Sequence, residues 1–137
     1  MNGELKVDLG ALAHNFQVFS RGRPSRVAAV VKANAYGIGI KEVATKLWEL
    51  GCREFFVAFV EEGKVLRSIL SAAQIYVFAG INPSPAEMQN SIREYLDHEL
   101  IPILNSIEQC RGWSGVGSTA ALHVDTGMTR LGIAPED

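Results

Sequence analysis

Residues 26–37 read RVAAVVKANAYG. The first seven are almost continuously apolar, which is typical of a parallel strand that is buried on both faces. Lys32 ends this run, and small residues with Gly37 follow it, as in a turn. Active sites of parallel α/β proteins gather at the carboxyl ends of the strands. The stretch therefore predicts an α/β fold in which a rigid strand delivers an amine to that edge.

The rest of the chain repeats this strand pattern, with a helical pattern between one strand and the next. Further buried strands are predicted at residues 55–60, 74–79, 100–104 and 120–124. One helix has a defined start, because Ser84 can cap it and Glu87 can close a capping box. Alternation of this kind indicates right-handed β-α-β units around a parallel sheet.

The segment before residue 26 has a different pattern. Leu5 to Leu9 alternates apolar and polar residues, and Gly10 interrupts it before a helical pattern begins. Strict alternation is typical of a half-buried strand. We therefore expect a short separate strand over residues 5–10.

Two α/β architectures agree with this alternation. A five-stranded doubly wound domain would be complete at 137 residues. A β/α barrel of the TIM type needs eight units and typically about 250 residues. Periodicity and length alone favour the doubly wound domain.

Composition restricts the kind of partner. The chain is 47% hydrophobic and 20% charged with a formal charge of −2, and it has no basic stripe, so we expect a small-molecule ligand and no nucleic acid. No apolar run reaches the roughly 18 to 20 residues that a membrane helix needs, and no signal sequence follows Met1. We therefore expect a cytoplasmic protein without membrane contact. Cys52 and Cys110 lack metal-ligand spacing, so reduced thiols and no metal site are expected.

Lys32 is the first candidate functional residue. A lysine at the end of a strand is most often simply solvated. Val30 and Ala28 share its face of the strand, however, and apolar neighbours favour the neutral, nucleophilic amine. An amine of this kind suits Schiff-base chemistry.

A second candidate lies near the end of the chain, where residues 122–133 read LHVDTGMTRLGI. This is again a strand followed by a glycine-bearing turn. The guanidinium of Arg130 offers a fixed fork of donors for a carboxylate or phenolate oxygen and keeps its charge. Without further context, an exposed arginine is usually a solvated charge.

The two stretches together resemble motifs of the bacterial alanine racemases. VVKANAYG resembles their pyridoxal-phosphate attachment signature, and DTGMTRLG resembles a second motif in the family's order and at nearly its separation. Glu61 and Glu62 also stand where such racemases have them. The resemblance covers essentially the whole chain and overrules the doubly wound interpretation. It implies that residues 1–137 are the N-terminal part of the protein and that residues 26–137 form the first five strands of a partial β/α barrel.

The resemblance also implies a role for each site residue. Lys32 would bind pyridoxal 5'-phosphate as a Schiff base and act as one of two catalytic bases. Tyr36 would donate a hydrogen bond to the cofactor phosphate. Arg130 would contact the cofactor's phenolic oxygen and the substrate carboxylate, and Met128 would line the same site.

Two positions depart from the family pattern. Ile38 stands where the family usually has histidine, which removes a polar group near the cofactor. His123 stands where the family often has lysine, carbamylated in some members. His123 and Asp125 share a strand face, so a purely structural pair remains an alternative.

The activity implied is the interconversion of L-alanine and D-alanine, carried out by a homodimer of the full-length protein. The family's opposing catalytic tyrosine, its last three barrel units and its C-terminal β-domain have no counterpart in this sequence. We therefore expect the chain to be inactive alone. The alternatives are a non-catalytic cofactor-binding or interaction module that retains Lys32, and an ordinary doubly wound binding domain.

Overall fold

The computed structural model describes residues 3–135, so residues 1–2 and 136–137 of the predicted range lie outside it. The described residues form one parallel five-stranded sheet in the order β1-β2-β3-β4-β5. The strands are β1 (Ala29–Val30), β2 (Glu54–Val57), β3 (Gln74–Val77), β4 (Ile101–Leu104) and β5 (Ala121–Leu122). Each strand pairs with the next one along the chain, as consecutive units of a β/α barrel do. The predicted partial barrel with five parallel strands is confirmed.

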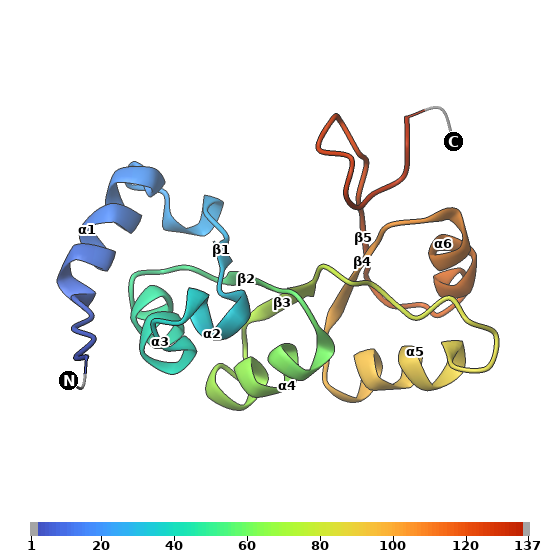
Figure 1. The fold of residues 1–137 in the computed structure, drawn as a ribbon, viewed down its shortest axis with the longest axis horizontal. Helices are drawn as coiled ribbons and strands as arrows, with labels where there is room; N and C mark the ends of the chain where they lie inside the picture. The colour runs from blue at the N-terminus through green and yellow to red at the C-terminus, as the bar shows by residue number, and fades with distance from the viewer. Residues whose placement is uncertain (1–2, 136–137) are drawn as a thin grey trace.

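Helices connect the strands. They are α1 (Leu9–Ser20), the 3-10 turn η1 (Pro24–Arg26), α2 (Lys32–Tyr36), α3 (Ile40–Glu49), α4 (Val60–Ile69), α5 (Met88–Asp97) and α6 (Ile107–Trp113). Figure 1 shows α3, α4 and α5 in a row along one side of the sheet, whereas the loop after β5 rises from the other side. None of the helices within residues 3–135 is long and apolar enough to span a membrane.

The core lies between the sheet and these helices. Phe55 and Val57 of β2 and Ile75 and Val77 of β3 point to the helical side and are fully buried. Leu66 of α4 meets them there and is also fully buried. Because side chains alternate along a strand, this set fixes the register of the sheet and sends the intervening residues to the opposite face.

That opposite face is the inner face of the partial barrel. On it the rings of Phe56 and Tyr76 stack at 4.6 Å, and Phe78 lies 5.4 Å from Phe56. At the two edges Val30 is 43% exposed and Leu122 is 62% exposed. In a closed barrel this surface is packed core. Within residues 3–135 the inner face is only partly covered.

The separate strand expected over residues 5–10 is not formed. Residues 3–8 have no regular secondary structure, and α1 begins at Leu9. The carboxylate of Asp8 accepts hydrogen bonds from the amides of Gly10 (2.8 Å) and Ala11 (3.0 Å). Asp8 is therefore a helix cap. Alternation predicted a strand, but no strand of the described chain pairs with this segment, and a strand needs a partner for its hydrogen bonds.

The capping box predicted at the start of α5 is also absent. The helix begins at Met88, and no side chain caps it. Residues 84–87 form a turn instead, in which the Ser84 carbonyl accepts hydrogen bonds from the amides of Glu87 (3.0 Å) and Met88 (2.8 Å). The side-chain oxygen of Asn82 accepts a hydrogen bond from the Ser84 amide at 3.0 Å. Ser84 is therefore held through its backbone groups.

Candidate functional site

The chain leaves β1 through a left-handed turn. Ala33, Asn34, Ala35 and Tyr36 have φ values of 51°, 54°, 52° and 55°, so α2 is not an ordinary right-handed helix. Left-handed backbone costs about 1–2 kcal/mol for each residue that carries a Cβ. Four such residues in succession persist only where surrounding contacts hold them, and strain of this kind clusters at functional sites.

Two side chains supply contacts that hold the turn. The Asn34 side-chain oxygen accepts a hydrogen bond from the Ile40 amide at 2.9 Å, which ties the turn to the start of α3. The Glu62 carboxylate accepts from the Ala33 amide at 2.7 Å, which ties it to α4. Ala35 is 3% exposed and belongs to the core. Contacts with α3, with α4 and with the hydrophobic core therefore hold the turn.

Lys32 directly precedes these residues and is half-buried. Its Nζ lies 5.9 Å from the centroid of the Tyr36 ring and 5.8 Å from that of Phe78, within the range of cation–π attraction. The amine forms no ion pair with a carboxylate of residues 3–135. Its predicted apolar neighbours Val30 and Ala28 are exposed, because nothing in the described chain covers their side of β1.

The second motif forms a closed loop after β5. Val124 and Ile133 are bridged, and the Asp125 amide donates to the Ile133 carbonyl at 2.9 Å. Inside the loop the Asp125 carboxylate accepts from the amides of Thr129 (3.0 Å) and Gly127 (2.9 Å). These bonds hold the pKa of Asp125 below its ordinary 3.8. Asp125 therefore acts as the internal brace of the loop.

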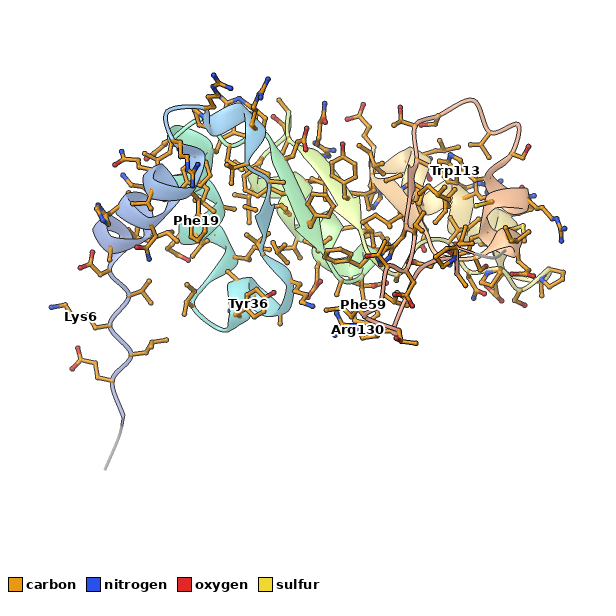
Figure 2. The ribbon with its side chains drawn as sticks, turned by 90° about the horizontal axis from the view of Figure 1, so that it is seen from above. Lys6, Phe19, Tyr36, Phe59, Trp113 and Arg130 are labelled. Carbon is orange, nitrogen blue, oxygen red and sulfur yellow. The ribbon has the colours of Figure 1, made fainter. Side chains whose placement is uncertain are left out.

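This loop carries Arg130 and Met128. Arg130 is exposed and Met128 is 76% exposed. Figure 2 shows Tyr36, Phe59 and Arg130 along one edge of the molecule, at which the strands end. The structure thus brings the two predicted motifs to the same edge, where Arg130 forms no ion pair with a carboxylate of residues 3–135.

His123 is hydrogen-bonded to Asn105, and its Nδ1 lies 2.8 Å from the amide oxygen. An amide oxygen only accepts, so Nδ1 carries the proton of this bond. The Asn105 side chain in turn donates to the carbonyls of Phe78 (2.7 Å) and Ile103 (2.9 Å). The carboxylate of Asp125 is engaged with its own loop. His123 is therefore held by the neighbouring strand end.

Gln109 of α6 joins the same group of polar contacts, which pattern reasoning missed. Its side-chain oxygen accepts a hydrogen bond from the backbone amide of Asn105 at 2.6 Å. Its side-chain nitrogen donates to the carbonyls of Ile81 (2.7 Å) and Ala79 (3.1 Å). Gln109 is only 7% exposed. A glutamine in a helix is usually a surface residue. The one sequence signal was Gly80, whose φ of 65° and missing Cβ allow Gln109 to approach.

The donors at this edge are an amine, a phenol and a guanidinium, which suits an anionic coenzyme that carries an aldehyde. Lys32 is half-buried and has the exposed ring of Tyr36 beside its amine. Within residues 3–135 no group of histidine, cysteine, aspartate and glutamate side chains could hold a metal ion. By their chemistry, the amine, the phenol and the guanidinium at this edge fit pyridoxal phosphate.

The sequence is similar to proteins of known family. A family model described as "Alanine racemase, N-terminal domain" matches residues 7–137. The chain is 42% identical over 142 residues to an alanine racemase of Rhizobium meliloti (strain 1021), covering 99% of this chain and 36% of the relative. It is 44% identical over 139 residues to the biosynthetic alanine racemase of Agrobacterium fabrum, covering 97% and 34%.

Solved structures agree with this. The alanine racemase from Bartonella henselae, crystallised with covalently bound pyridoxal phosphate, matches with a TM-score of 0.80 and 32% identity. The match covers 95% of this chain and 37% of that one. The chain thus spans about a third of the length of the proteins it resembles.

Proposed function

We propose, because this chain belongs to the alanine racemase family, that it forms the part of an L-alanine/D-alanine racemase that holds pyridoxal phosphate. The observation that carries the proposal is the position of Lys32. Its half-buried amine stands at the carboxyl end of β1, ahead of a held left-handed turn, in a chain that aligns along 99% of its length with an alanine racemase. The relative from Bartonella henselae carries the coenzyme covalently bound.

In this proposal Lys32 would hold the coenzyme at its aldehyde carbon, with water as the leaving group, and its amine, once displaced by the substrate amine, would hold or move a proton at the substrate α-carbon. Bound pyridoxal phosphate supplies an electron sink for the charge left when that proton departs. Tyr36 would donate a hydrogen bond to the phosphate. Arg130 keeps its charge and would bind the phenolic oxygen and the substrate carboxylate. Met128 lines the site with apolar surface.

Racemization needs a base on each face of the α-carbon, and Lys32 supplies one of them. We infer that the second base, the remaining barrel units and a C-terminal β-domain belong to the rest of a longer protein that acts as a homodimer. The incompletely covered inner face around Val30 and Leu122 supports this division. The chain by itself is then a cofactor-binding piece without racemase activity.

The test is covalent trapping. The chain is incubated with pyridoxal phosphate, reduced with borohydride and mapped by peptide mass spectrometry. We expect the label on Lys32 and its loss in Lys32→Ala, with weaker coenzyme binding in Arg130→Ala. Label spread over surface lysines with Lys32 unmodified would refute the assignment.

A second measurement separates the racemase from a non-catalytic cofactor-binding module. The full-length protein that contains this chain is assayed for D-alanine formed from L-alanine, with Lys32→Ala as the control. Turnover that depends on Lys32 supports the racemase. Trapping at Lys32 without turnover in the full-length protein would identify the binding module.

A further inference from the structure

The carboxylate of Glu62 connects the ends of two neighbouring strands. One oxygen accepts a hydrogen bond from the Ala33 amide at 2.7 Å. The other accepts from the amides of Ala58 (2.6 Å) and Phe59 (3.2 Å), which follow β2. All three donors are backbone N–H groups. The half-buried carboxylate therefore binds only backbone at the edge where the candidate site lies.

The first of these donors has a special position. The Ala33 amide belongs to the peptide unit that joins Lys32 to Ala33, and Ala33 opens the left-handed turn with a φ of 51°. A hydrogen bond to this amide fixes the plane of that peptide unit. The direction in which the Lys32 side chain leaves the backbone depends on that plane.

Glu62 does not act by pairing with the lysine. Within residues 3–135 no ion pair joins the Lys32 amine to a carboxylate. The negative charge is surrounded by three N–H donors, which hold it in place. The amine lies beside the Tyr36 ring, 5.9 Å from its centroid.

We propose that Glu62 is a positioning residue, whose carboxylate fixes the peptide unit after Lys32 and so aims the amine without touching it. The inference rests on the proposed role of Lys32 as the coenzyme-binding amine. It explains how residues that carry a Cβ remain left-handed at this point. We call this set of hydrogen bonds from the Glu62 carboxylate of α4 to the backbone the clamp, and it holds the turn from a neighbouring helix.

Two variants of Glu62 distinguish the position of its carboxylate from its negative charge. Glu62→Gln offers one acceptor oxygen to three donors, so at least one N–H faces the new amide donor. Glu62→Asp keeps the charge but is one methylene too short to reach both strand ends. Glu61→Gln is the matched control, because Glu61 is exposed and has no hydrogen bond within residues 3–135. Ala33→Gly added to Glu62→Gln tests rescue, because glycine adopts the left-handed turn without a Cβ penalty.

The first readout is amide hydrogen exchange of the chain, which needs no coenzyme. Loss of the clamp should speed exchange at Ala33 and Ala58 by at least about tenfold in Glu62→Gln and Glu62→Asp. Exchange in Glu61→Gln should match the wild type. Unchanged exchange at Ala33 in both Glu62 variants would overturn the clamp, and circular dichroism confirms that each variant is folded. If Glu62→Gln does not fold, Glu62→Asp decides.

The second readout is borohydride trapping with pyridoxal phosphate, scored as label on Lys32 relative to the exposed Lys41 of the same molecule. A misdirected amine should lower this ratio about tenfold in both Glu62 variants. Ala33→Gly should restore most of it. Wild-type ratios in Glu62→Asp, or no rescue by Ala33→Gly, would overturn the inference. If the wild type does not favour Lys32, the proposed function fails instead, and the exchange data still judge the clamp.

Discussion

Replacing Gln109 with leucine tests the polar contacts beneath the candidate site. The change keeps the side-chain size but leaves the Asn105 amide and the buried Ile81 carbonyl without partners. Each buried polar group that loses its hydrogen bond costs about 1–3 kcal/mol. The carbonyl of Ala79 can turn to water because that residue is exposed. We expect the free energy of unfolding to fall by about 3 kcal/mol.

Urea unfolding measures this loss. With an m-value of about 2 kcal/mol/M, the midpoint should fall by about 1.5 M. Circular dichroism follows the helices, and the fluorescence of the two tryptophans, Trp48 of α3 and the buried Trp113 of α6, follows the loss of packing around them. Gln89→Leu is the matched control, because Gln89 is an exposed glutamine of α5 and the substitution is the same. A difference between the two variants below about 0.5 kcal/mol would refute the reasoning.

Three further outcomes are expected. Burial raises the pKa of the Cys52 thiol, so a thiol reagent should modify the half-buried Cys110 first and Cys52 only as the chain unfolds; equal rates would contradict this. Hydrogen bonds led by the Thr129 amide lower the pKa of Asp125, so this contribution to loop stability is fully present above pH 3.8 and is lost as the pH falls through the folded pKa. The amide chemical shift of Thr129 should therefore titrate with a midpoint below 3.8, and a higher midpoint would exclude the brace. Gly80→Ala should cost at least about 3 kcal/mol in urea unfolding, because its Cβ would meet a backbone oxygen of β4 at 2.5 Å; a near-neutral variant would be unexpected.

Much of the fold could be predicted because burial imposes its pattern directly on the sequence. The run from Arg26 to Lys32 contains β1 and the apolar segment at 74–79 contains β3, whereas the segment at 55–60 overlaps β2, which begins one residue earlier at Glu54. Whereas β4 ends at Leu104 as predicted, the structure ends each of these three strands two or three residues earlier than predicted. There the chain turns into the loops of the site, where hydrogen bonds to side chains such as Glu62 replace the ladder.

The failures share one physical cause. Leu5 to Leu9 and Ser84 to Glu87 each carry a local pattern that the structure overrules through hydrogen bonds. A short alternating segment predicts a strand only if another strand is available to pair with it. The left-handed turn was equally invisible, because alanine, asparagine and tyrosine have no preference that predicts four consecutive positive φ values.

The sequence motifs indicate residues for the candidate site but give no sign of the residues that support them. Lys32 and Arg130 stand in specific motifs, and the structure brings both motifs to the edge where the strands end. Asn105 and Gln109 occur in no motif, and their hydrogen bonds to Phe78, Ala79, Ile81 and His123 span 18 to 30 residues of chain. Contacts between side chains and distant backbone groups leave no periodic trace in a sequence.

The strand order has a consequence for how this protein is made. Each strand after β1 pairs with the strand synthesised just before it, so no pairing has to wait for a distant segment. We expect the sheet to grow by addition at one edge while the nascent chain leaves the ribosome, amino terminus first. A force-sensitive arrest peptide placed after each strand in turn should then report a series of pulling events, and a single late event would mean that the units assemble together.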